Sequence, residues 1–159
     1  MRGQRIDRGM TVLGGLVATL AMTVFLYLVL PTLRRDPFML PTVLESLFGL
    51  PWVAGVLLHL VLGTFVFPLL FIAIYDVLPG RSWVRGMIWG SVLWFVAELV
   101  VVPIAGGGFF HAESGGLAAV MGFLGAHLLY GAALGGIARA SVPRSREASL
   151  VEERRVAGR

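Results

Sequence analysis

The chain has 159 residues, of which 57% are hydrophobic and 14% charged, and its mean hydropathy is +0.86. This composition is too apolar for a soluble domain. Cysteine is absent, which excludes disulfides, thiolate metal sites and iron–sulfur clusters. All thirteen basic residues are arginines, and they lie at the ends of the apolar runs. Arginines in those places set topology and attract anionic lipid headgroups, and they argue against nucleic-acid binding.

A transmembrane helix needs about 20 apolar residues, and the chain has four such runs. They are Met10–Leu30, Val53–Leu78, Gly86–Ala105 and Leu117–Ala138. Eleven arginines lie before the first run, between the second and third, and after the fourth, whereas two lie on the other side. This imbalance predicts that both termini are cytoplasmic. We therefore expect an all-α, multi-pass protein of the bacterial inner membrane, with a four-helix transmembrane domain over residues 1–140 and a cytoplasmic Arg/Glu-rich tail over 141–159.

The first outer loop, Pro31–Pro51, is rich in apolar residues. Thr42 and Glu45 within it match the T-x-x-E capping box that begins many helices. We therefore expect a short interfacial helix in this loop.

The chain also shows an internal similarity. Gly14–Pro31 aligns with Gly86–Pro103, and the second and fourth runs share His-Leu-x-x-Gly, beginning at His59 and His127. The offsets are similar, so the pattern predicts two similar helical hairpins in parallel orientation.

Three of the runs carry one His or Glu each deep inside, and each of these residues shares a helix face with glycines. The residues are His59, Glu98 and His127. Glycines four residues apart let helices approach closely, and the polar group on the same face is then directed at a neighbouring helix. A His or Glu in hydrocarbon costs several kcal/mol unless it is paired. We therefore expect the three side chains to share one polar site inside the bundle.

Several ligands suit such a site. His59 and His127 facing each other match the two axial ligands of haem b, and adding Glu98 gives an open zinc or iron site. Met22 and Met121 would complete a Cu(I) site with the two histidines. His111, in the second outer loop, is a further candidate ligand. His and Glu without a cofactor would instead form a proton relay.

These alternatives lead to one preferred function and two competitors. We expect a redox-linked or ligand-binding protein that holds haem b or a metal ion and is not an enzyme, because no phosphate-binding loop or nucleophile motif occurs in the sequence. The first competitor is a structural accessory subunit of a larger membrane complex, in which the polar residues join helices and the glycines dock a partner subunit or a second copy. The second is a proton or cation carrier.

The chain also resembles the YagU-like group of small bacterial inner-membrane proteins. The residues that carry the resemblance are the first run ending at Pro31, His59 followed by Tyr75, the glycine series from Arg85 to Trp94, Pro103 with Gly106, and Gly125-Ala126-His127. It covers about residues 10–138. The resemblance implies an inner-membrane protein and supports the fold, and it implies no particular activity.

Overall fold

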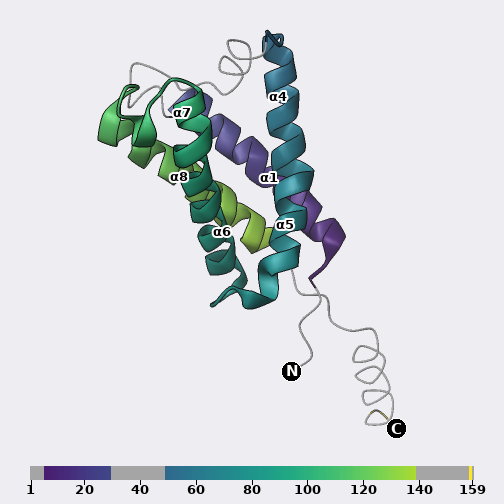
Figure 1. Cartoon of the computed structure of the whole chain (residues 1–159). Helices are drawn as coiled ribbons and strands as arrows, with labels where there is room; N and C mark the ends of the chain where they lie inside the picture. The colour runs from purple at the N-terminus through teal and green to yellow at the C-terminus, as the bar shows by residue number, and fades with distance from the viewer. Residues whose placement is uncertain (1–5, 30–48, 139–157, 159) are drawn as a thin grey trace.

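The computed structural model describes residues 6–29, 49–138 and 158 (Figure 1). Its helices, in chain order, are α1 (Arg8–Val24), η1 (Phe25–Val29), α4 (Trp52–Val61), η2 (Leu62–Val66), α5 (Phe67–Ile74), η3 (Tyr75–Val77), α6 (Ser82–Val96), η4 (Ala97–Val101), α7 (Val102–Ile104), η5 (Phe109–His111) and α8 (Gly116–Ile137). The predicted interfacial helix and the predicted cytoplasmic tail lie outside the described residues.

These elements join into four continuous helices that are long and apolar enough to cross a membrane. They are Arg8–Val29, Trp52–Val77, Ser82–Ile104 and Gly116–Ile137. Each boundary lies within a few residues of the sequence prediction, so the prediction of four apolar, membrane-length helices is confirmed. The cytoplasmic placement of the termini and the bacterial inner membrane stay predictions.

Three of the four long helices widen into a π-helical segment in the middle or toward the end: η1, η2 and η4. Each segment ends two residues before a proline, at Pro31, Pro68 or Pro103. Proline has no N–H to donate, and its ring collides with the carbonyl four residues earlier. A wide turn just before the proline relieves that collision. The fourth helix, α8, contains no proline and is α-helical throughout.

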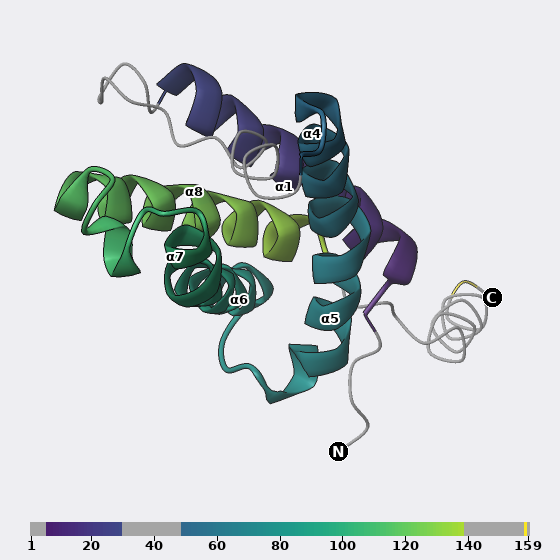
Figure 2. The same cartoon turned by 45° about the horizontal axis from the view of Figure 1, so that its top comes forward.

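The long helices pack in the order α5, α1, α8, α6. α1 and α8 lie side by side in the middle, η2 and α5 pack on α1, and α6 packs on α8 (Figure 2). α4, the first half of the second span, touches little besides α1 and its own continuation. The bundle is therefore open between α4 on one side and α6 on the other.

Glycine faces make the closest contacts in this bundle. A Cβ placed on Gly86 would overlap the backbone carbonyl of Gly131, and one on Gly90 would overlap that of His127. On the other side of the bundle, a Cβ on Gly15 would overlap the Pro68 ring. These contacts confirm that the glycine faces predicted from the four-residue spacing meet neighbouring helices. The predicted two-hairpin repeat stays a prediction.

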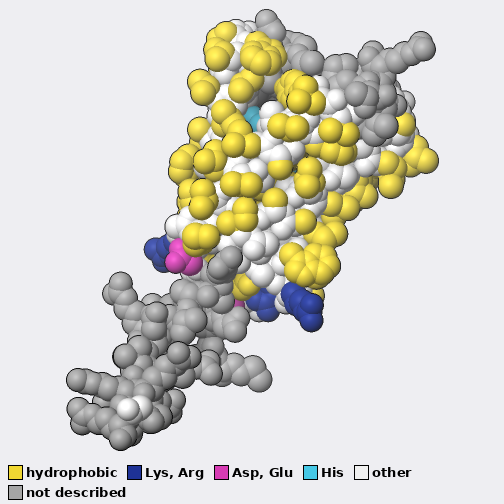
Figure 3. Space-filling model, turned by 180° about the vertical axis from the view of Figure 1, so that it is seen from behind, with side chains coloured by type: hydrophobic (Ala, Val, Ile, Leu, Met, Phe, Trp, Pro, Cys, Tyr) yellow, Lys and Arg dark blue, Asp and Glu magenta, His cyan; other side chains and the backbone are white. Residues whose placement is uncertain are grey.

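The outer surface is apolar in the way that a lipid-facing surface requires. On the face seen in Figure 3, hydrophobic side chains cover the body of the molecule, and the visible Arg, Asp and Glu side chains lie at one end. Large apolar residues from all four spans are 38–80% exposed, whereas the described arginines lie at helix ends. Only a few polar side chains remain inside, and these define the candidate site.

Candidate functional site

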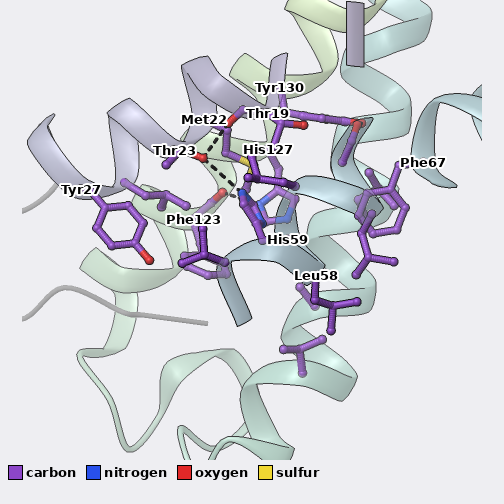
Figure 4. Close-up of a pocket in the computed structure, with 18 of the residues that line it drawn as sticks. Thr19, Met22, Thr23, Tyr27, Leu58, His59, Phe67, Phe123, His127 and Tyr130 are labelled. Atoms are coloured by element: carbon purple, nitrogen blue, oxygen red, sulfur yellow. Dashed lines mark hydrogen bonds between the residues drawn. The ribbon is translucent and has the colours of Figure 1, made fainter. Parts of the chain in front are cut away.

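A pocket of about 500 Å³ opens between α4 and α6. α1 and α8 form its floor, α4 and η2 one wall, and α6 and η4 the other. Its lining is largely apolar and includes seven polar or sulfur-bearing side chains that Figure 4 labels: Thr19, Met22, Thr23, Tyr27, His59, His127 and Tyr130. The pocket exists because α4 does not close against α6, so side chains on the two middle helices face open space.

A hydrogen bond joins the floor of the pocket to one of its walls. The Tyr130 hydroxyl of α8 donates to the backbone carbonyl of Gly63 in η2, at 2.7 Å. In η2 the bonds run five residues back, as from the Phe67 N–H to Leu62. The next bond in that register would run from Pro68 to Gly63, and proline has no N–H. Tyr130 therefore supplies the Gly63 carbonyl with the donor that the helix lacks.

His127 is held by its own helix. Its Nδ1 lies 2.9 Å from the backbone carbonyl oxygen of Phe123, and a carbonyl oxygen only accepts, so Nδ1 carries a proton. The neutral imidazole then has an unprotonated Nε2, which can accept a hydrogen bond or ligate a metal. His127 is 8% exposed, and that small exposed area belongs to a side chain that lines the pocket.

A neighbouring helix orients the His59 ring. The hydrogen bonds of Thr23 show which nitrogen of that ring carries the proton. Its Nε2 lies 3.3 Å from the Thr23 hydroxyl. The single proton of that hydroxyl goes to the Thr19 carbonyl, at 2.8 Å. The Thr23 oxygen therefore accepts, and His59 Nε2 donates. In the neutral ring this leaves Nδ1 as the acceptor, so each histidine is oriented through one nitrogen and keeps the other for a ligand.

The pocket lining contains no Asp, Glu, Lys or Arg among the described residues. Its polar groups are neutral hydroxyls and two imidazoles that lie together at the centre of the view in Figure 4. A charged ligand entering from the membrane would find no opposite charge on this lining, and burying an unpaired charge is strongly unfavourable. The lining therefore favours a neutral ligand.

Glu98 is not among the lining residues and forms a second polar centre with His111. The two side chains are both 0% exposed, and His111 Nε2 lies 3.6 Å from Glu98 Oε1. Neither carboxylate oxygen has a hydrogen bond of ordinary geometry within the described part of the chain, although Trp94 is a polar neighbour of the carboxyl group.

The loop between the third and fourth spans carries His111 into the bundle. Phe110 and His111 have positive φ angles of 51° and 54°, a backbone region that costs non-glycine residues of order 1–3 kcal/mol each. The Phe110 ring packs 6.2 Å from the rings of both Trp94 and Phe95. Ser114 holds the imidazole, with its hydroxyl 2.8 Å from His111 Nδ1. Packing and hydrogen bonding thus keep a strained loop folded inward.

The structure divides the predicted site residues between these two centres. His59, His127 and Met22 line the pocket, Glu98 and His111 form the second centre, and Met121 belongs to neither and is 56% exposed on the outer surface. Within residues 6–29 and 49–138, no three His, Asp or Glu side chains are grouped as metal ligands. The expected convergence of Glu98 with both histidines is therefore not seen, and neither is a Cu(I) site that includes Met121.

Two contacts at these centres were not predicted from the sequence: Tyr130 with Gly63, and Glu98 with His111. Tyr130 lies in an apolar run and comes three residues after His127, so its hydroxyl had no predicted partner. The pairing of Glu98 with His111 depends on an irregular loop. A signal for Tyr130 was present in Pro68, because a proline inside a transmembrane helix leaves a carbonyl that needs an outside donor.

The chain belongs to a family of unknown function, DUF6789, whose sequence profile matches residues 7–149. No curated protein and no solved structure matches it. The YagU-like resemblance finds no support in these comparisons and stays a prediction.

Proposed function

We propose that the protein binds a neutral, mainly apolar molecule of the bilayer through the pocket between α4 and α6, and that a hydroxyl group of that molecule donates to His127. The observation that carries this proposal is the pairing of an uncharged, largely apolar lining with two oriented imidazoles, each of which keeps one acceptor nitrogen. Apolar pockets with a few placed polar groups are typical ligand sites.

The two acceptor nitrogens of His59 and His127 favour a ligand that can donate a hydrogen bond. A ketone or an ester has only acceptors to offer, whereas a phenol, hydroquinone or alcohol donates an O–H to an unprotonated imidazole nitrogen. The volume of about 500 Å³ holds a ring and part of an apolar tail. The opening between α4 and α6 leaves the remainder of the tail in lipid. An isoprenoid hydroquinone has all three features.

Haem b is the second candidate, because two histidines share one cavity and His127 donates through Nδ1 to a backbone carbonyl, as metal-ligating histidines commonly do. Two features favour the neutral ligand over haem. His59 Nε2 is engaged by Thr23, and the described lining offers no cation to the two haem propionates. An absorption spectrum and elemental analysis of the purified protein distinguish haem or a bound metal from the neutral ligand.

The test is a binding titration of the full-length protein in detergent with an isoprenoid hydroquinone, monitored by tryptophan fluorescence, because one of the four tryptophans, Trp52, lines the pocket. Loss of one hydrogen bond costs about 1 kcal/mol, so His127→Phe should raise Kd about five- to tenfold. Met121→Leu is the matched control, because Met121 faces away from the pocket, and it should leave Kd unchanged.

The same titration with an analogue whose hydroxyls are methylated tests whether the hydroxyl–imidazole contact exists. If that analogue binds as tightly as the hydroquinone, or if His127→Phe binds the hydroquinone as tightly as the wild type does, the hydroxyl–imidazole contact does not exist and the proposal fails.

A further inference from the structure

The four hydroxyl groups that line the pocket differ in whether the protein itself uses their protons. Those of Thr19, Thr23 and Tyr130 each donate to a backbone carbonyl oxygen, at 2.7, 2.8 and 2.7 Å respectively. The fourth belongs to Tyr27, in η1, and it has no hydrogen-bond partner within the described part of the chain. The half-buried Tyr27 side chain therefore offers the pocket a donor that is available to a ligand.

Tyr27 lies about one helical turn beyond the two histidines. Thr23, which accepts the hydrogen bond from His59, comes four residues before Tyr27, so the two residues share a face of the first span and are about 6 Å apart along it. The donor of Tyr27 and the oriented imidazole of His59 are therefore separate points of contact in one pocket.

The packing of α8 places His127 at the same level as Thr23. A Cβ on Gly14 would lie 3.2 Å from the Ile137 side chain, and one on Gly125 would lie 3.7 Å from the Phe25 ring. The first span and α8 therefore run antiparallel, and counting two residues from the contact between Gly125 and Phe25 brings His127 level with Thr23. The same count in the other direction brings Phe123 level with Tyr27.

The pocket thus has acceptor nitrogens at one level and a donor hydroxyl at the next. Figure 4 shows the Tyr27 ring to one side of the two imidazoles. Leu26 and Phe123, which also line the pocket, supply apolar surface at the level of Tyr27. A flat ring that is polar at both ends and apolar along its faces complements this arrangement.

The Trp52 indole N–H is a second donor on the lining without a hydrogen-bond partner in the described residues. Trp52 precedes His59 by seven residues, which is about 10 Å along the helix, and its side chain is 47% exposed. This separation is nearly twice that between Thr23 and Tyr27. Trp52 therefore lies at the mouth of the pocket, next to the tail of a ligand and not next to its ring.

We infer that the pocket recognises an aromatic ring with oxygen atoms at opposite ends, and that Tyr27 donates a hydrogen bond to the second oxygen while the first hydroxyl donates to His127. The two oxygens of a 1,4-dihydroxybenzene ring are separated by roughly one helical turn, about 5.4 Å. A ring with one hydroxyl leaves Tyr27 without an acceptor. This inference rests on the proposed function and narrows its ligand class from alcohols and phenols to aromatic 1,4-diols.

Isothermal titration calorimetry of the full-length protein in detergent tests this inference with two ligands. One is a 1,4-hydroquinone with a short isoprenoid tail, and the other is the phenol with the same tail and a single hydroxyl. The wild-type protein should bind the phenol about five- to tenfold more weakly, the loss expected for one hydrogen bond. Tyr27→Phe keeps the ring and removes the donor, so it should weaken hydroquinone binding by that factor and leave phenol binding unchanged.

The ratio of the two Kd values is the decisive readout, because a general disturbance of the pocket changes both. Trp52→Phe removes the other donor and should keep the wild-type ratio. The inference is overturned if Tyr27→Phe leaves the ratio unchanged, or if Trp52→Phe abolishes it. In either case, a loss of affinity for both ligands in His127→Phe would leave the proposed function standing. If neither ligand binds the wild-type protein, both proposals fail.

Discussion

The close contact of α6 with α8 predicts a large effect from a very small change. In Gly86→Ala, the new methyl group would occupy the position of the Gly131 carbonyl oxygen. Backbone cannot rotate away as a side chain can, so the two helices must separate. Forcing an extra methyl group into a packed interface typically costs about 1–3 kcal/mol, and we expect Gly86→Ala to lower the free energy of unfolding by about that amount.

The matched control lies one residue beyond the contact face. A Cβ on Gly136 meets nothing within 4 Å, and alanine has the higher helix propensity by about 1 kcal/mol. Gly136→Ala should therefore be neutral or stabilising. Reversible unfolding in mixed detergent micelles, monitored by circular dichroism, measures both. Equal stability of the two variants would show that α6 and α8 do not approach through their glycine faces.

The remaining predictions concern the pocket and its supports. Tyr130→Phe should destabilise the protein by about 1–2 kcal/mol in the same unfolding assay, because the Gly63 carbonyl loses its donor. Pro68→Ala restores a backbone N–H to the helix at the end of η2, so Tyr130→Phe should cost less in that background, and additive effects in the double-mutant cycle would contradict this. Thr23→Val should weaken hydroquinone binding severalfold by releasing the His59 ring, and an unchanged titration would show that the ring needs no such orientation.

The four spans and the glycine contacts were predictable because each depends on a regular helical repeat. Apolar runs of membrane length identify the helices, and glycines four residues apart share one face in any α-helix. The neighbouring helix that Gly86 and Gly90 contact is α8. The same repeat places His59 on the face of Gly55 and His127 on the face of Gly131, and both histidines lie in the pocket lining.

The partner of Glu98 was not predictable by the same reasoning. Glu98 is the second residue of η4 and still lies beside Trp94, four residues earlier, so the helical repeat accounts for its own position but does not identify its partner. Its partner His111 comes from a loop in which Gly106, Gly108, Phe110 and His111 all have positive φ. Periodicity carries no information about such a loop, so the pairing became visible only in three dimensions.

The two polar centres differ in how their groups are held. In the pocket, burial among apolar side chains disfavours a charge on His59 and His127, and each donates one N–H to a protein acceptor and keeps a lone pair for a ligand. At the second centre, the His111 imidazole lies beside the Glu98 carboxyl group and contacts the Ser114 hydroxyl through its other nitrogen. The loop reaches this position only with left-handed backbone at Phe110 and His111, and the packing of the Phe110 ring against Trp94 and Phe95 offsets part of that cost.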